Sequence, residues 1–240
     1  MIDPNDNETI ENLEREEINF PRIQFIDNPL QRNRTTIIEA YTNIFNKGYA
    51  AYLADLDWDR DGDIDWQNNM LQHLHGIILQ MIEAYRNNNN DELLKKIFIY
   101  IQLWGGNAGR NIFLQSGGFE HNFNIKIYKK FVKLTINSEF NNARIRLNKM
   151  TQIGTAFSTK HLHFWSNTEA PIYDSIISKI VFGRKNPNNK ADYPRYMTAL
   201  YDLAEEEGPN VTSSIIERSI FNWSDTEEGK LWSDLRMKTL

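Results

Sequence analysis

The residues best suited to chemistry lie in one stretch, from Met150 to Ser175. We expect a helix to begin near Gly154, closely behind another helix. The backbone N–H groups of Gly154, Thr155 and Ala156 then have no partner within their own helix and point outward. Such N–H groups bind phosphate, because their positive ends converge on one point. The sequence therefore predicts an anion site at this turn.

A carboxylate stands at the start of the next expected helix, in the sequence Pro171-Ile172-Tyr173-Asp174-Ser175. Because proline suits the first turn of a helix, we expect this helix to span about 171–181, with Asp174 in its first turn. The commoner role of an aspartate there is to cap the helix. A catalytic role for Asp174 depends on the resemblance given below.

A second candidate site lies in the run from Asp57 to Asp65. It matches the opening of an EF-hand loop, in which alternate acidic side chains bind calcium and Gly62 makes the turn. Asn68 replaces the usual bidentate glutamate, which should weaken calcium binding. Either a structural Ca²⁺ or an acidic loop without an ion fits this pattern. The expected ligands are Asp57, Asp59, Asp61 and Asp63.

The elements that would position these residues are helices. Apolar residues recur at helical spacing almost throughout, and strand-like alternation is almost absent. We therefore expect an all-α chain with irregular helix packing, comprising an acidic arm over 1–33 and a helical domain over 34–240. Asn87 to Asn90 indicate a surface loop. The predicted helices span 35–53, 66–85, 93–104, 126–136, 138–149, 155–165, 171–181, 193–207, 211–221 and 226–237.

Charge is distributed unevenly along the chain. The formal net charge is −5. The segment from Lys126 to Arg195 nevertheless holds 13 Lys and Arg against 4 Asp and Glu, a net of +9. A basic segment in an acidic protein predicts one cationic face, which is typical of nucleic-acid binding. A solvated helical surface is the alternative.

Composition excludes several classes of protein. Hydrophobic residues make up 40% of the chain, enough for a core rather than general disorder. The chain has no cysteine, so disulfides, thiolate catalysis and cysteine-ligated metal centres are excluded. No apolar run approaches the roughly 20 residues of a membrane span. We expect a cytoplasmic protein with no membrane partner.

The hairpin and the aspartate together resemble the helix-hairpin-helix DNA glycosylase superfamily, especially its prokaryotic 8-oxoguanine-glycosylase-like branch. The resemblance covers about 94–181, including Trp104-Gly105-Gly106 and the segment from Phe157 to Ser175. It implies two helical lobes flanking a cleft and a helix-hairpin-helix at about 140–165. In that family the turn grips one DNA phosphate, and the catalytic aspartate follows about 18 residues later. Asp174 lies 18 residues after Ala156.

Two departures from the family pattern affect the expected chemistry. Gln152 replaces the first glycine of the turn, so the grip on phosphate is altered. Ala156 stands where bifunctional members carry their nucleophilic lysine, and Lys160 lies one helical turn further on. Lys160 could be a nucleophile, a partner of DNA phosphate or of Asp174, or a surface lysine.

The reaction implied by the resemblance is hydrolysis of an N-glycosidic bond. A carboxylate near C1′ stabilises the positive charge that develops on the sugar, or deprotonates a water. Without a placed lysine, the product is an abasic site, and no cofactor is needed. The base must leave the duplex first. The residues that could contact the substrate or DNA are Trp104, Asn107, Arg110, Gln152, Gly154, Thr155, Ala156, Phe157, His161, Trp165 and Tyr173.

The sequence thus favours a monomeric, monofunctional glycosylase that acts on double-stranded DNA containing a modified base. An oxidised purine and a modified cytosine both remain open, as do genome repair and defence against phage DNA. Two other functions also fit. One is a non-catalytic DNA-binding module that uses the hairpin alone, and the other is a calcium-binding interaction protein built around the Asp57 loop.

Overall fold

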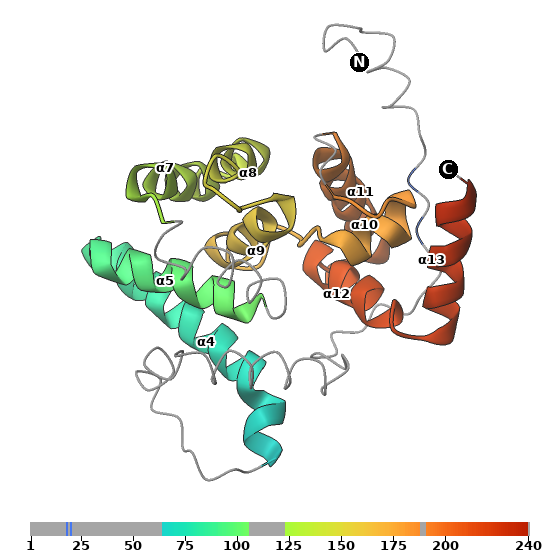
Figure 1. The fold of residues 1–240 in the computed structure, drawn as a ribbon, viewed down its shortest axis with the longest axis horizontal. Coiled ribbons are helices and arrows are strands. Elements are labelled where there is room, and N and C mark those ends of the chain that lie inside the picture. Colours follow the sequence, from blue (N-terminus) through green and yellow to red (C-terminus); the bar gives the residue numbers. More distant parts are fainter. Residues whose placement is uncertain (1–17, 19, 21–63, 106–122, 188–190, 240) are drawn as a thin grey trace, which may run out of the picture. The chain divides into compact units, whose positions relative to one another are not determined.

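The computed structural model describes residues 18, 20, 64–105, 123–187 and 191–239, excluding the side chains of 64–73 and 239. Within these ranges the chain forms nine helices and no strand (Figure 1). The all-α prediction is confirmed. The predicted helix over 35–53 and the Asp57, Asp59, Asp61 and Asp63 loop lie outside the described residues. None of the described helices is long and apolar enough to cross a membrane.

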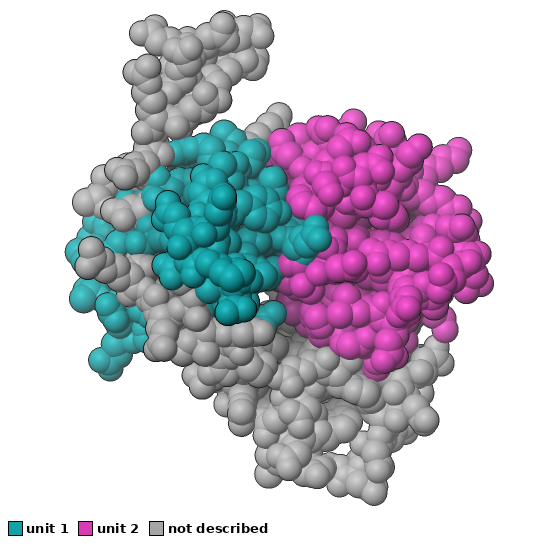
Figure 2. All heavy atoms as spheres, turned by 180° about the vertical axis from the view of Figure 1, so that it is seen from behind, with its two compact units in different colours: residues 1–28, 169–240 teal, residues 29–168 magenta. Residues whose placement is uncertain are grey.

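The chain divides into two compact units, which Figure 2 colours separately. Unit 1 comprises 1–28 and 169–240, and unit 2 comprises 29–168. The division between Thr168 and Glu169 falls inside the region that the sequence assigns to one two-lobed domain.

Unit 2 is built around one central helix. Its helices are α4 (Ile64–Asn88), α5 (Asp91–Trp104), α7 (Ile125–Ile136), α8 (Phe140–Leu147) and α9 (Thr155–Trp165). In Figure 1, α9 lies between the α4–α5 pair and the α7–α8 pair, and it contacts all four helices. Nine of its eleven residues are buried.

Two asparagines, Asn89 and Asn90, separate α4 from α5. The predicted loop over Asn87–Asn90 is shorter, because α4 continues to Asn88. Asn89 turns the chain with a φ of 52°. The side chain of Asn90 accepts hydrogen bonds from Glu92 N and Leu93 N, and so caps α5.

Unit 1 comprises α10 (Ser175–Phe182), α11 (Asp192–Glu207), α12 (Ser213–Trp223) and α13 (Glu227–Thr239). Helix α13 holds the C-terminal end of α10 by two side-chain hydrogen bonds. Trp232 Nε1 donates to Ile180 O at 3.0 Å, and the Arg236 guanidinium donates to Val181 O at 2.6 Å. These bonds satisfy carbonyl groups that the end of a helix leaves without partners.

A hydrogen-bonded polar chain runs through the core of unit 2. The Gln102 amide lies 2.8 Å from His161 Nε2, and His161 Nδ1 lies 2.8 Å from the Tyr128 hydroxyl. Trp165 Nε1 donates to the same hydroxyl at 2.9 Å. With the amide donating to Nε2, the neutral ring carries its proton on Nδ1 and donates to Tyr128. A second proton on the ring would point at another donor.

Burial, together with the charge of Lys160, lowers the pKa of His161 to about 3. Burial raises the pKa of Tyr128 above its usual range, so its phenol stays protonated. Both rings are therefore neutral at ordinary pH. This explains how α9 accommodates polar side chains inside an apolar core.

We predict that His161→Gln flattens the pH dependence of folding stability. The unfolded histidine binds a proton below its ordinary pKa of 6.5, whereas the folded one does so only near 3. The stability that the neutral ring contributes is therefore complete above that ordinary pKa. Below that pKa, this contribution to the free energy of unfolding falls by about 1.4 kcal/mol for each pH unit. Urea midpoints between about pH 7 and pH 4 measure the slope, and equal slopes in both proteins would contradict this account.

Candidate DNA-binding and catalytic site

The region where a helix-hairpin-helix is predicted, about 140–165, contains two helices joined by a turn. Helix α8 ends at Leu147 and α9 begins at Thr155. Within the turn, Gln152 has a φ of 64° and Ile153 N donates to Met150 O at 3.2 Å. Gln152 thus adopts the left-handed conformation that glycine takes without strain.

The start of α9 has the open form that an anion site needs. Its N-cap is Gly154, which is exposed and has no side chain to accept the first N–H groups. Thr155 is buried, and its hydroxyl lies 3.4 Å from the Arg144 guanidinium. Ala156 is half-buried. The start of α9 is therefore accessible to an anion at Gly154 and, in part, at Ala156.

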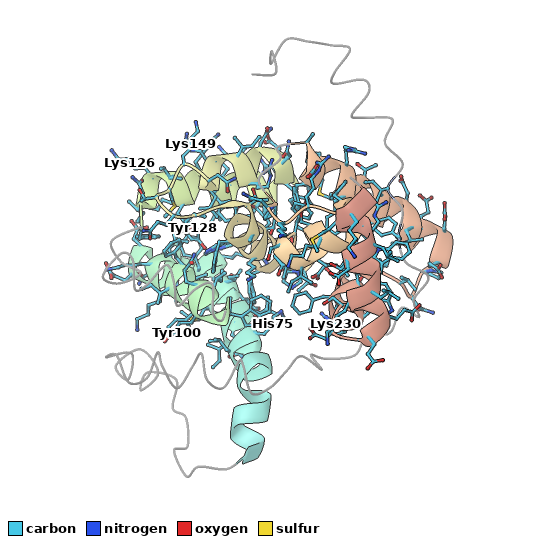
Figure 3. All side chains as sticks on the ribbon, turned by 45° about the vertical axis from the view of Figure 1, so that its right-hand side comes forward. His75, Tyr100, Lys126, Tyr128, Lys149 and Lys230 are labelled. Carbon is cyan, nitrogen blue, oxygen red and sulfur yellow. The ribbon has the colours of Figure 1, made fainter. Side chains whose placement is uncertain are left out.

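Lysines line the outer side of α7 because its buried face follows helical spacing. Tyr128, Phe131, Val132 and Thr135 are buried, which leaves the lysines exposed. From 123 to 160 the chain carries eight Lys and Arg and one Glu. Figure 3 shows Lys126 and Lys149 pointing away from the core and Tyr128 lying within it.

The basic side chains near the hairpin have different surroundings. Lys129 forms an ion pair of 2.6 Å with Asp91 of α5. The half-buried Lys160 places Nζ 5.0 Å from the centre of the Phe157 ring, a cation–π contact. Lys126, Lys130 and Lys133 are exposed on one face of α7. The last three are best placed to meet a polyanion.

Asp174 is the N-cap of α10, and the predicted start of this helix at Pro171 is wrong. The backbone of Asp174 is extended, with φ −116° and ψ −174°, so α10 begins at the next residue, Ser175. Asp174 Oδ1 accepts from Ile176 N at 2.9 Å and from Ile177 N at 3.1 Å. Among the described residues, Oδ2 makes no hydrogen bond. Asp174 as a whole residue is 9% exposed.

Most of the aromatic candidates are core residues. His161 and Trp165 belong to the polar chain described above. Tyr173 is buried and donates to Ser178 Oγ at 3.1 Å. Phe157 is 4% exposed, and a Cβ at Gly105 would lie 2.5 Å from its ring. These four side chains offer almost no surface to a ligand in this structure.

Trp104 is the exception among the aromatic candidates, since it is half-buried at the end of α5. Its ring meets Phe164 edge to face, with centroids 5.1 Å apart. Asn107 and Arg110 lie outside the described residues. The hairpin, Trp104 and Lys160 belong to unit 2, whereas Tyr173 and Asp174 belong to unit 1.

A hollow of about 370 Å³ lies among α10, α13 and the end of α12, within unit 1. It is lined by Ile176, Lys179, Lys230 and Asp234, among others, but not by Asp174. No group of three or more His, Asp or Glu side chains able to hold a metal occurs in the described parts of the chain.

Sequence reasoning missed two buried polar residues of unit 1, namely Tyr196 of α11, whose ring contacts that of Tyr173, and Glu217 of α12, whose charge acts on Tyr196. Tyr196 lies at ordinary core spacing among apolar residues, so its pattern gives no sign of a polar role. Only the packing of α11 and α12 in unit 1 brings these residues together.

Comparison with known proteins gives no relative. No protein-family model, no curated protein and no solved structure matches this chain.

We predict that Gln152→Gly keeps or raises folding stability, by up to about 1 kcal/mol. Glycine adopts the left-handed conformation of this position without steric cost. Thr151→Gly is the matched control at the neighbouring position, whose φ is negative. It should lower stability by about 0.5–1 kcal/mol. Urea unfolding measures both, and equal losses would contradict the argument.

Proposed function

We propose that this protein is a monofunctional DNA glycosylase that uses Asp174 to excise a modified base from double-stranded DNA. The observation that carries the proposal is the hairpin turn. Gln152 takes the left-handed conformation that glycine adopts without strain, and Gly154 begins α9 without a capping side chain. The first backbone N–H groups of a helix that lacks a capping side chain can bind a DNA phosphate, which supports the proposal.

The hydrogen bonds of Asp174 suit the proposed reaction. Two backbone N–H groups of α10 hold Oδ1 in place. Oδ2 is then the oxygen that stabilises the developing sugar cation or deprotonates a water. The base leaves the stack before the bond breaks. No metal or other cofactor takes part in this chemistry, and a Ca²⁺ in the Asp57 loop would be structural.

Lys160 acts in this proposal as a contact to DNA rather than as the nucleophile. Its amine lies over the Phe157 ring and projects from α9. A lysine nucleophile would give a Schiff base and strand cleavage, whereas an aspartate gives an abasic site and an intact strand. The protein would act as a cytoplasmic monomer, in repair or in defence against modified phage DNA. An oxidised purine and a modified cytosine are both candidate substrates.

A non-catalytic DNA-binding module is the second candidate. The observation that favours it is the capping role of Asp174, which by itself accounts for a buried aspartate at a helix start. Both candidates share the hairpin and the lysines, and they differ only in whether a base is released.

We predict that Asp174→Asn abolishes base release and leaves the fold and DNA affinity intact. Asparagine caps a helix as well as aspartate does, but it carries no charge. Asp174→Ala, which removes the cap, should cost about 0.5–2 kcal/mol of stability. The measurements are released base from a panel of modified DNAs, DNA affinity and urea unfolding.

Three further outcomes of that experiment are decisive. Near-normal release by Asp174→Asn would refute the catalytic role. A wild type that binds DNA and releases no base would favour the binding module. Borohydride should trap no adduct, and a trapped adduct that disappears in Lys160→Gln would identify Lys160 as the nucleophile.

We predict that reversing Lys130 and Lys133 to Glu weakens DNA binding. Each lysine that contacts a phosphate contributes about one unit to the slope of log affinity against log salt. The matched control reverses Lys230 and Lys238, two exposed lysines of α13 in unit 1, with the same change of charge. Binding titrations at several salt concentrations measure the slopes. Equal effects of the two pairs would show that α7 does not face DNA.

A further inference from the structure

Within the described part of unit 1, one buried hydroxyl has no hydrogen-bond partner, and it belongs to a ring that contacts Tyr173, the residue before Asp174. Tyr196 of α11 is 0% exposed, and among the described residues its hydroxyl makes no hydrogen bond. Burying a hydroxyl that makes no hydrogen bond lowers folding stability, and a phenylalanine would fill the same space without this loss. The stability of unit 1 therefore gives no reason for this hydroxyl.

Helix α11 packs directly against the segment that leads into Asp174. The Tyr193 hydroxyl donates to Pro171 O at 3.3 Å, and the ring centres of Tyr173 and Tyr196 are 5.3 Å apart. Tyr196 thus lies against the chain between Pro171 and Asp174, inside unit 1.

Two carboxylates lie within electrostatic reach of the Tyr196 hydroxyl. Burial, then the charge of Glu217, then that of Asp174, raise the pKa of Tyr196 well above its ordinary value. The phenol is therefore protonated at all working pH values, and it can donate one hydrogen bond but cannot act as a base. Glu217 has further interactions of its own.

Asp174 has one oxygen to receive such a bond. The two backbone N–H groups of α10 both bind Oδ1, and Oδ2 has no hydrogen bond among the described residues. Two hydrogen bonds to the same oxygen, Oδ1, leave the carboxylate plane free to tilt. A hydrogen bond donated to Oδ2 would fix that plane.

We propose that Tyr196 is a positioning residue for Asp174, whose buried hydroxyl donates to the Asp174 carboxylate when substrate is bound. This inference rests on the proposed glycosylase activity and adds a residue to the same site. Tyr196 touches neither the base nor the sugar, and it acts by holding the reacting carboxylate in its orientation.

The test is Tyr196→Phe in the full chain, which removes only the hydroxyl. We expect single-turnover base release to fall by about 10- to 100-fold, because misplacing a catalytic group has effects of this size. DNA affinity should stay unchanged, and the melting temperature should stay unchanged or rise. A residue needed only for the fold would instead lower the melting temperature.

Tyr128→Phe is the matched control, since that phenol is equally buried but hydrogen-bonded to His161 and Trp165. It should lower the melting temperature and leave base release by the folded protein unchanged.

Each other outcome overturns the inference. If Tyr196→Phe releases base at the wild-type rate while Asp174→Asn is inactive, Tyr196 has no role in the site, and the proposed glycosylase activity is still supported. Loss of stability or of DNA affinity in Tyr196→Phe shows a structural or binding role instead. A wild type that releases no base from any modified DNA refutes the proposed function, and the role of Tyr196 with it.

Discussion

Nine of the eleven residues of α9 are buried, Ala156 and Lys160 being the two that are partly exposed, and the organisation of unit 2 depends on this burial. A helix surrounded by four others has no solvent for its polar side chains, so each must find a partner inside the protein. His161 finds two, in Gln102 of α5 and Tyr128 of α7. These bonds tie both neighbouring helices to α9 and fix its position. Its start, at Gly154, is then presented at the surface by a rigid support.

Helix α7 likewise has one buried face and one exposed face. Its apolar face packs into the unit around Tyr128, and the remaining positions carry lysines into solvent. Lys126, Lys130 and Lys133 are thereby exposed on one face of α7, which packs against α8 of the hairpin. Lys129 is exposed too, but it is engaged in an ion pair with Asp91. Attraction of a polyanion depends on such clustering, and the net charge of the chain does not describe it.

In unit 1 the capping bonds of Asp174 fix where α10 begins, and they engage only one oxygen of the carboxylate. The second oxygen is the one to which the proposed function assigns a chemical role. A structural role and a chemical role are therefore compatible in Asp174, because a carboxylate has two oxygens. Around it, Tyr173, Tyr193 and Tyr196 make a buried layer whose phenols bond to Ser178 and Pro171, apart from that of Tyr196.

The sequence by itself determined the helical class and the position of most described helices, because periodicity and capping are local. It also placed the turn at Gln152–Gly154 and singled out Asp174. It could not tell that His161, Trp165 and Tyr173 are core residues, since a polar or aromatic side chain at helical spacing has the same pattern inside and outside. Nor could it find Tyr196 beside Asp174. Burial and hydrogen bonding between residues far apart in the chain exist only once the helices pack, and the tertiary structure alone decided them.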